Sequence, residues 1–330
     1  MRNHGTSRAR YAVLATEMLS VRDSDGTRMK GEGIGPMKIV FASGKGGTGK
    51  TTIAVNLAYF LAHSNQKIQY LDCDVEEPNG HLFLKPQMTS KKPVKVMVPI
   101  IDEDKCTYCA ECGAHCEYKA IVNLPSVTMI FPELCHSCGL CLKVCPIGAI
   151  REGEREVGYT EEGKAFQNIE FIHGVLNVGE PMATPVIKEV KDKYNNGYMQ
   201  IIDAPPGSSC PVVKTMTDAD FVVLVTEPTP FGLHDLKIVV SVARNMRKPF
   251  GVVVNRNQGN FMPLKNYLEE ENIPLLMVLP EDRRIAESYS RGEVIIKNLP
   301  DFRDNFADLI TNIIMITGKD LMRKTGVLHG

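Results

Sequence analysis

A glycine-rich segment between a short apolar run and a helical pattern constrains this chain more than any other feature. Residues 44–51 read GKGGTGKT, which fits the phosphate-loop pattern GxxxxGK[ST]. The apolar run Ile39–Ala42 precedes the segment as an expected strand, and Lys50–His63 follow as an expected helix. Glycines let the backbone wrap a phosphate group, and the helix N-terminus adds a partial positive charge. The segment therefore predicts a nucleotide-phosphate site on an α/β fold, with a glycine-rich turn that binds no ligand as the alternative.

Further apolar runs alternate with helical patterns along the rest of the chain. The other expected strands are Ile68–Leu71, Met199–Ile202, Phe221–Val225, Gly251–Val254 and Leu275–Val278. The other expected helices are Thr184–Lys193, Leu233–Met246, Leu264–Glu271, Glu281–Ser290 and Phe302–Ile316. Runs bounded by turn residues and separated by helices are typical of a parallel sheet that helices cover on both faces. We therefore predict an α/β fold with a mostly parallel, doubly wound sheet and a small domain inserted after its second strand.

These patterns divide the chain into three parts. Residues 1–36 show no sustained periodicity, and we interpret them as a mobile N-terminal extension, with a regulatory arm as the alternative. Residues 37–90 and 155–330 form the predicted nucleotide-binding domain. Residues 91–154 form the insertion, which holds eight of the ten cysteines of the chain. Dense clustering of cysteines at short spacing indicates metal ligation in a reducing compartment, so we expect a cytoplasmic protein.

Charge and hydropathy exclude several function classes. The chain has 38 Lys+Arg and 39 Asp+Glu, so its net charge of −1 gives no whole-chain reason to expect a nucleic-acid partner. No apolar run approaches the roughly 18–20 residues that a membrane helix needs. The last expected helix carries an apolar stripe, which we interpret as core packing and not as a stable membrane anchor: Leu309, Ile310, Ile313 and Ile314.

The insertion contains two cysteine runs with the same CxxCxxCxxxC spacing, and the second repeats the first 29 residues later. This spacing is the [4Fe–4S] ligand pattern of two-cluster ferredoxins, in which the fourth ligand comes from the other run. We therefore predict a small α+β domain of the bacterial-ferredoxin type. Tetrahedral zinc is the alternative, but it normally uses paired cysteines across a longer gap. The predicted ligands are Cys106, Cys109, Cys112 and Cys145 for cluster 1, and Cys116, Cys135, Cys138 and Cys141 for cluster 2.

The remaining cysteines and nearby histidines receive simpler interpretations. Cys73 lies in an expected strand and is interpreted as a core residue. Cys210 is interpreted as a buried small residue, with a redox or metal-binding thiol at a dimer interface as the alternative. His115 and His136 lie beside predicted ligands and are expected at the surface.

The phosphate loop has a second lysine, Lys45, and this resembles the deviant phosphate loop of the MinD/ParA/nitrogenase-iron-protein group. Four further segments match that group in order: residues 71–74 (LDCD), 201–207 (IIDAPPG), 252–256 (VVVNR) and 280–286 (PEDRRIA). The resemblance implies a homodimer that holds ATP at its interface, with Lys45 of each subunit reaching the other subunit's nucleotide. It also implies two switch segments that move on ATP hydrolysis, one after Asp74 and the other after Asp203.

The resemblance further implies the roles of individual residues. Lys45, Lys50 and Asp74 are the expected catalytic residues, and Asp74 is expected to orient the attacking water. Thr51 and Asp203 are the expected Mg²⁺ ligands. The expected nucleotide-binding residues are Gly44, Lys45, Gly46, Gly47, Thr48, Gly49, Lys50, Thr51, Thr52, Asn255, Arg256 and Pro280.

The whole pattern resembles MinD-superfamily phosphate-loop ATPases that carry an inserted ferredoxin domain. The expected cofactors are ATP or ADP, Mg²⁺ and two [4Fe–4S] clusters. The expected activity is slow or partner-stimulated ATP hydrolysis that gates electron transfer to a redox or cofactor-assembly partner protein. An ATP-dependent carrier of iron–sulfur clusters or metallocofactors, and a MinD-like spatial regulator, are the alternatives.

Overall fold

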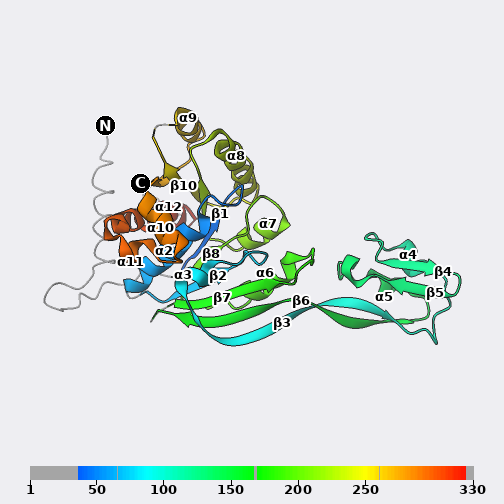
Figure 1. Ribbon diagram of the computed structural model, residues 1–330. Helices are drawn as coiled ribbons and strands as arrows, with labels where there is room; N and C mark the ends of the chain where they lie inside the picture. The colour runs from blue at the N-terminus through cyan, green and yellow to red at the C-terminus, as the bar shows by residue number, and fades with distance from the viewer. Residues whose placement is uncertain (1–35, 65, 167–168, 260, 325–330) are drawn as a thin grey trace.

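The computed structural model describes residues 36–64, 66–166, 169–259 and 261–324, so the expected extension at residues 1–36 lies outside the described residues except for Pro36. The strands of the central sheet are β1 (Lys38–Ala42), β2 (Ile68–Asp72), β3 (Gln87–Ile101), β6 (Ile150–Ala165), β7 (Ile169–Leu176), β8 (Met199–Asp203), β9 (Phe221–Thr226), β10 (Phe250–Asn257) and β11 (Leu275–Pro280). Within the described residues they form one nine-stranded sheet in the order β11-β10-β9-β1-β8-β2-β7-β6-β3 (Figure 1). The strands from β11 to β7 are parallel, whereas β6 is antiparallel to both of its neighbours.

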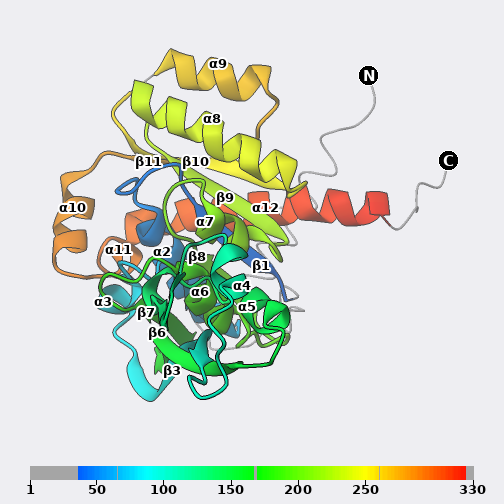
Figure 2. The same ribbon diagram turned by 90° about the vertical axis from the view of Figure 1, so that its right-hand side faces the viewer.

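Helices cover both faces of this sheet. They are α2 (Lys50–His63), α3 (Gly80–Leu84), α6 (Ala183–Lys191), α7 (Cys210–Met216), α8 (Pro230–Asn245), α9 (Met262–Glu270), α10 (Arg283–Ser290), α11 (Ile295–Asn298) and α12 (Arg303–Lys324). Figure 2 shows α8 and α9 beside each other near β10 and β11. In β1, Phe41 belongs to the core that contains α2 and α12, whereas Val40 belongs to the core that contains α6 to α9. Two cores on opposite faces confirm the predicted doubly wound, mostly parallel α/β fold.

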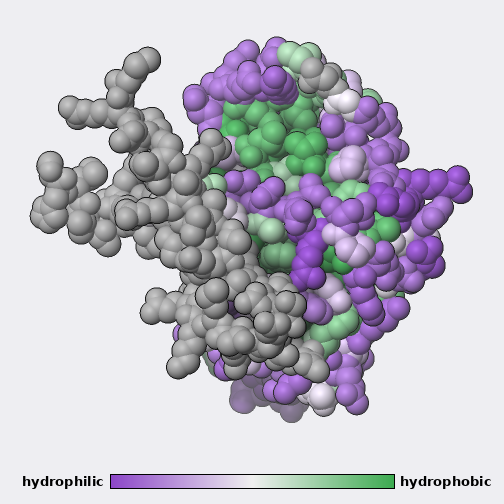
Figure 3. Space-filling view, turned by 90° about the vertical axis from the view of Figure 1, so that its left-hand side faces the viewer, coloured by the Kyte–Doolittle hydropathy of each residue, from purple (hydrophilic) through white to green (hydrophobic). Residues whose placement is uncertain are grey.

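Every strand and helix that the sequence predicts is present, with ends displaced by a few residues at most sites. The apolar stripe on α12 is confirmed as core, because Leu309, Ile310 and Ile313 are fully buried and Ile314 packs against the same cluster. Within the described residues, no helix has both the length and the apolarity that crossing a membrane requires. Figure 3 shows an apolar area on the surface opposite the cysteine-rich end.

The strands β3, β6 and β7 are absent from the sequence predictions. β3 and β6 pair with each other from Gln87–Lys164 to Ile101–Ile150, and only the part of β6 from Gly158 onward also pairs with β7. The rest of the pair extends away from the sheet as a two-stranded arm (Figure 1). The expected domain boundaries at residues 91 and 154 fall inside β3 and β6, so the arm belongs partly to the sheet and partly to the insertion.

The far end of the arm carries a small unit, residues 102–149, which we call the cysteine module (Figure 1). It consists of α4 (Glu111–Ala114), β4 (Ile121–Leu124), β5 (Val127–Ile130), a short 3-10 helix (Pro132–Leu134) and α5 (Leu140–Val144). Outside this module, a second 3-10 helix (Pro300–Phe302) precedes α12. Val98 of β3 packs with Ala120 and Cys135 in a small apolar cluster. This cluster joins the module to the arm.

Candidate nucleotide site and cysteine-lined cavities

The phosphate loop connects β1 to α2 at the carboxyl end of the parallel strands. Gly47 and Gly49 have φ of 79° and 88°, in the left-handed region that favours glycine. A Cβ at Gly44 would lie 2.3 Å from the carbonyl oxygen of Asp235 in α8. The hydroxyl oxygen of Thr48 is buried and has no hydrogen-bond partner. A bound phosphate group would satisfy this orphaned hydroxyl, so the loop fits a nucleotide.

Lys50 and Thr51 meet Asp203 at the start of α2. Lys50 Nζ lies 2.9 Å from Asp203 Oδ1 and 3.7 Å from Asp74 Oδ2. The hydroxyl of Thr51 donates a hydrogen bond to Asp203 Oδ2, and the side chain of Asp203 is fully buried. Burial alone would lower the pKa of Lys50, but the attraction of Asp203 and Asp74 outweighs burial and raises it. The structure therefore gathers one cation, a hydroxyl and two carboxylates where the γ-phosphate and Mg²⁺ of a nucleotide would lie.

Asp72 anchors the segment that follows β2, and the sequence motifs give it no role. Its carboxylate accepts hydrogen bonds from the backbone N–H of Asp74 at 3.1 Å and of Gly80 at 2.9 Å. Residues 72–80, which we call the first switch, are thereby closed into a loop. Burial, with a contribution from Asp203, raises the pKa of Asp72 to about 8. Burial raises the pKa of Asp74 to about 6, against the opposing effect of Lys50.

The raised pKa of Asp72 predicts a pH-dependent stability in the nucleotide-free protein. Its ordinary pKa is 3.8, so between this pH and about 8 the folded chain binds more protons than the unfolded chain. The free energy of unfolding therefore falls as pH rises through this range. We expect Asp72→Asn, which has no proton to lose, to lessen the fall in stability between about pH 5 and about pH 8 in urea unfolding. The exposed control Asp304→Asn should keep the wild-type slope; equal slopes in the two variants would contradict the assignment.

Lys45 is held by contacts within its own chain. Lys45 Nζ lies 3.4 Å from Glu227 Oε2, and Arg256 Nη1 donates to Glu227 Oε1 at 2.6 Å. Asn255 Nδ2 donates to the carbonyl oxygen of Thr48 at 2.8 Å, so Asn255 braces the phosphate loop. Glu227 is a contact of this site that no motif in the sequence marks.

Pro280, the last of the expected nucleotide-binding residues, lies close to Asn255 and Arg256. Pro280 ends β11 and pairs with Asn257 of β10. The backbone N–H of Glu281 donates to the carbonyl oxygen of Asn257 at 3.1 Å. The structure therefore brings together residues 255–257 and 280–281, which are distant in sequence, at the carboxyl end of the sheet.

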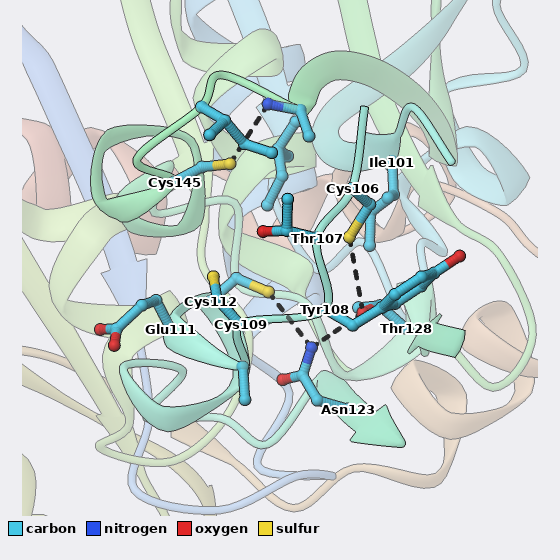
Figure 4. A pocket seen from close by; sticks show the side chains of 14 residues that line it. Ile101, Cys106, Thr107, Tyr108, Cys109, Glu111, Cys112, Asn123, Thr128 and Cys145 are labelled. Atoms are coloured by element: carbon cyan, nitrogen blue, oxygen red, sulfur yellow. Dashed lines mark hydrogen bonds between the residues drawn. The ribbon is translucent and has the colours of Figure 1, made fainter. Parts of the chain in front are cut away.

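Two cavities in the cysteine module are each lined by four cysteines. Figure 4 shows the four sulfur atoms of the first set around one space. The fourth cysteine of each set comes from the other run, so the structure brings together the same four residues that the spacing groups. Within the described residues, no three Cys, His, Asp or Glu side chains are placed to hold a single metal ion. The sets are Cys106, Cys109, Cys112 and Cys145 (first), and Cys116, Cys135, Cys138 and Cys141 (second).

The other cysteines and histidines divide between core and surface. Cys73 is fully buried, which confirms the prediction, whereas Cys210 is exposed at the start of α7. The interpretation of Cys210 as a buried residue is therefore wrong, because α7 begins at the surface and its first buried residue is Val212, two positions further on. His115 and His136 are exposed, as predicted, and His136 stacks on Tyr118 with ring centroids 3.7 Å apart.

The sequence model of the CobQ/CobB/MinD/ParA nucleotide binding domain family matches residues 39–295. The chain belongs to this family. An uncharacterised protein of Methanocaldococcus jannaschii is 33% identical over 284 residues, which are 84% of this chain and 98% of that relative. A cytosolic Fe–S cluster assembly factor, the Nubp2 homologue of Anopheles gambiae, is 24% identical over 80% of this chain and 90% of its own length. The septum site-determining protein MinD of Pyrococcus horikoshii, complexed with Mg-ADP, superposes with a TM-score of 0.50 at 22% identity and covers 88% of this chain and 97% of its own.

The CobQ/CobB/MinD/ParA match spans the phosphate loop, both predicted switch segments and the strand that contains Asn255. The likeness to MinD, at this identity, supports the fold of the sheet. The match and the geometry agree on a nucleotide-binding domain whose loop, Lys50, Thr51 and Asp203 lie together. The cysteine module and the arm lie within the matched range as an elaboration of that domain.

Proposed function

We propose that this protein hydrolyses ATP and couples movement of its switch segments to electron transfer through two [4Fe–4S] groups held by the cysteine module. It acts in the cytoplasm as a homodimer with ATP at the interface. When bound, each group supplies a one-electron carrier. The observation that carries the proposal is a line of ionisable side chains that crosses the sheet from Asp203 to the arm.

The line follows the register of five adjacent strands. Asp203 of β8 lies opposite Asp72 of β2, and Asp72 lies opposite His173 of β7. His173 lies opposite Glu161 of β6, which lies opposite Lys91 of β3. Residues in register on neighbouring strands point to the same face of the sheet. We call these five residues the ionisable row.

The row connects the first switch to the arm through short contacts. His173 Nε2 lies 2.9 Å from Glu161 Oε2, and Lys91 Nζ lies 3.6 Å from Glu161 Oε1. At the switch end, Asp72 holds the N–H of Gly80, and the ring of the next residue, His81, meets the ring of His173 with centroids 5.4 Å apart. A movement of the first switch therefore changes contacts to β6, the strand that continues to the cysteine module.

Nucleotide binding supplies the movement. With MgATP bound, Lys50 would exchange its contact with Asp203 for the γ-phosphate, and Thr51 and Asp203 would hold Mg²⁺. In the ATP dimer, Lys45 leaves Glu227 for the partner's nucleotide, and Asp74 orients the attacking water. Because Asp74 and Asp72 lie in the same closed loop, a movement of Asp74 on nucleotide binding would also move Asp72, a member of the ionisable row.

A second candidate function is an ATP-dependent iron–sulfur or metallocofactor carrier. Similarity to a cytosolic Fe–S cluster assembly factor over most of both chains favours it. The exposure of Cys109 and Cys138, one in each cysteine set, would also permit transfer. Against it, each cavity has four cysteines, a full ligand set that favours a resident electron carrier. A MinD-like spatial regulator is the third candidate, on the likeness to MinD alone.

The proposal is tested by EPR of anaerobically purified, dithionite-reduced protein with and without MgATP, together with iron and sulfide analysis. We expect about eight iron atoms per chain and a cluster signal or midpoint that shifts with MgATP. Zinc in place of iron would contradict both the electron-transfer proposal and the carrier proposal. Eight iron atoms with no MgATP effect, even with a partner protein present, would favour the carrier.

The row itself is tested with Glu161→Gln, which weakens the contacts to His173 and Lys91. This variant touches neither the phosphate loop nor a cysteine, so we expect wild-type ATP binding and iron content but a reduced MgATP-induced EPR shift. The matched control is Glu156→Gln, which changes an exposed residue of the same strand outside the row. Equal shifts in the two variants would show that coupling does not pass through the row.

A further inference from the structure

We infer that Asn123 and Thr128 make the two cysteine sites electronically unequal, raising the reduction potential of the first site above that of the second. The first site is the set Cys106, Cys109, Cys112 and Cys145. The inference rests on the proposed function, because it concerns groups that the two sites would hold. It goes beyond that function by giving the transferred electron a direction within the module.

Asn123 and Thr128 lie opposite each other in the β4–β5 hairpin. Asn123 Nδ2 donates to Cys112 Sγ at 3.5 Å and to Thr128 Oγ1 at 2.9 Å (Figure 4). Thr128 Oγ1 lies 4.0 Å from Cys106 Sγ. Because the hydroxyl oxygen of Thr128 already accepts from Asn123, its proton is free to point at Cys106. A ligating thiolate has no proton, so Thr128 is then the donor of that contact.

These contacts act on potential through charge. Reduction adds one negative charge, which spreads onto the ligating sulfurs, and a hydrogen bond to sulfur stabilises the more negative state. The backbone N–H of Ala149 adds a third donor to this set, to Cys145 Sγ at 3.2 Å. Three sulfurs of the first site therefore have a donor, and two of those donors are side chains that can be replaced.

The second site has a different environment. Among the described side chains, none donates a hydrogen bond to Cys116, Cys135, Cys138 or Cys141. The backbone N–H groups of Leu142 and Cys141 reach the Cys141 sulfur, so the two sites differ in their side-chain donors. The 29-residue repeat places Glu152 and Val157 at the positions of Asn123 and Thr128. Glu152 is exposed and Val157 is buried in the core of the sheet domain, so neither reproduces the pair. The repeat therefore reproduces the cysteine ligands but not the two side-chain donors.

Gly113 leaves the space that Asn123 occupies. A Cβ at Gly113 would lie 2.0 Å from Asn123 Oδ1. Alanine at this position would therefore push the amide of Asn123 away from Cys112 without altering Asn123 itself. Gly113→Ala thus tests the position of the amide, whereas Asn123→Leu tests its chemistry.

The difference in reduction potential between the two sites sets the direction of electron transfer within the module. One electron from an external low-potential reductant that enters at the second site passes to the first, so the second is reoxidised by one electron as the first is reduced by one. The electron then rests at the first site, beside the β4–β5 hairpin.

The experiment is a potentiometric EPR titration of the whole, iron-loaded protein. The wild type should show two midpoints. Asn123→Leu and Gly113→Ala should lower the higher midpoint potential by about 59 mV, which is a tenfold change in the one-electron reduction equilibrium. The lower midpoint potential should stay unchanged. Thr128→Val should shift the higher midpoint potential in the same direction. The control Leu124→Ala changes an exposed residue on the outer face of the same hairpin and should shift neither midpoint.

Three outcomes are informative. Wild-type protein without iron would overturn the proposed function and this inference together. Full iron with unchanged midpoints in Asn123→Leu and Gly113→Ala would overturn only the inference. Loss of half the iron in Asn123→Leu, Gly113→Ala and Thr128→Val would mean that Asn123 and Thr128 are needed to assemble the first site and do not tune its potential. This outcome also contradicts the inference.

Discussion

Asp74→Asn should bind MgATP with nearly wild-type affinity and hydrolyse it about 10²–10⁴ times more slowly. Asp74 Oδ2 lies 3.7 Å from Lys50 Nζ, so the side chain is within reach of the γ-phosphate region that Lys50 would contact. A carboxylate there can accept a hydrogen bond from the attacking water, whereas the amide of asparagine cannot act as a base. The effect should therefore fall on kcat, measured by steady-state phosphate release, while the Kd for a fluorescent ATP analogue stays the same.

The pKa of Asp74 adds a second signature to this variant. Because burial raises that pKa to about 6, the carboxyl is partly protonated just below neutral pH in the free protein. The value of kcat/KM in the wild type should rise with pH through about 6, and this rise should be absent from Asp74→Asn. Asp304→Asn, an exposed acid of α12 outside this segment, is the control and should keep both the rate and the pH profile. An Asp74→Asn variant with the wild-type rate would remove Asp74 from catalysis.

The parallel part of the sheet could be predicted from sequence because its strands are buried on both faces. Val40 and Phe41 point to opposite sides of β1, yet both are fully buried. Such a strand reads as a continuous apolar run, and the helix after it begins at Lys50 as the phosphate-loop motif requires. The nucleotide site was predictable for the same reason, since its residues follow the ends of these strands.

The arm could not be predicted because most of it faces solvent. β6 carries Glu152, Glu154 and Glu156 at alternate positions, and these give no apolar run to recognise. Its strand conformation depends on pairing with β3, from which residues 102–149 of the cysteine module separate it in the sequence. Tertiary pairing therefore decides a structure that local propensity leaves open.

Individual contacts of the sites show the same division. Spacing groups three cysteines of each run, because short loops bring three sulfurs together, and the two-cluster ferredoxin pattern supplies the fourth from the other run. Asp72, Glu227 and Asn123 have no such signal, since each acts through a residue far away in sequence or through its own backbone loop. Cys210 was misplaced because nothing in its sequence shows that α7 begins at the surface.

Exchange of the fourth ligand between the cysteine runs predicts the second large effect. Cys145 belongs to the second run but lines the first cavity, and Cys116 belongs to the first run but lines the second cavity. Cys145→Ala should therefore remove the group held with Cys106, reducing iron from about eight to about four atoms per chain. Loss of half the iron alone does not show which site was emptied, so the comparison must be made in pairs.

The residual EPR spectrum after each single replacement supplies that comparison. Cys145→Ala and Cys106→Ala should leave the same spectrum, that of the second site, whereas Cys116→Ala and Cys135→Ala should share the other. If each run instead held its own group, Cys145→Ala would match Cys135→Ala, and Cys116→Ala would match Cys106→Ala. Cys210→Ala, outside both sets, should keep the full iron content and both signals.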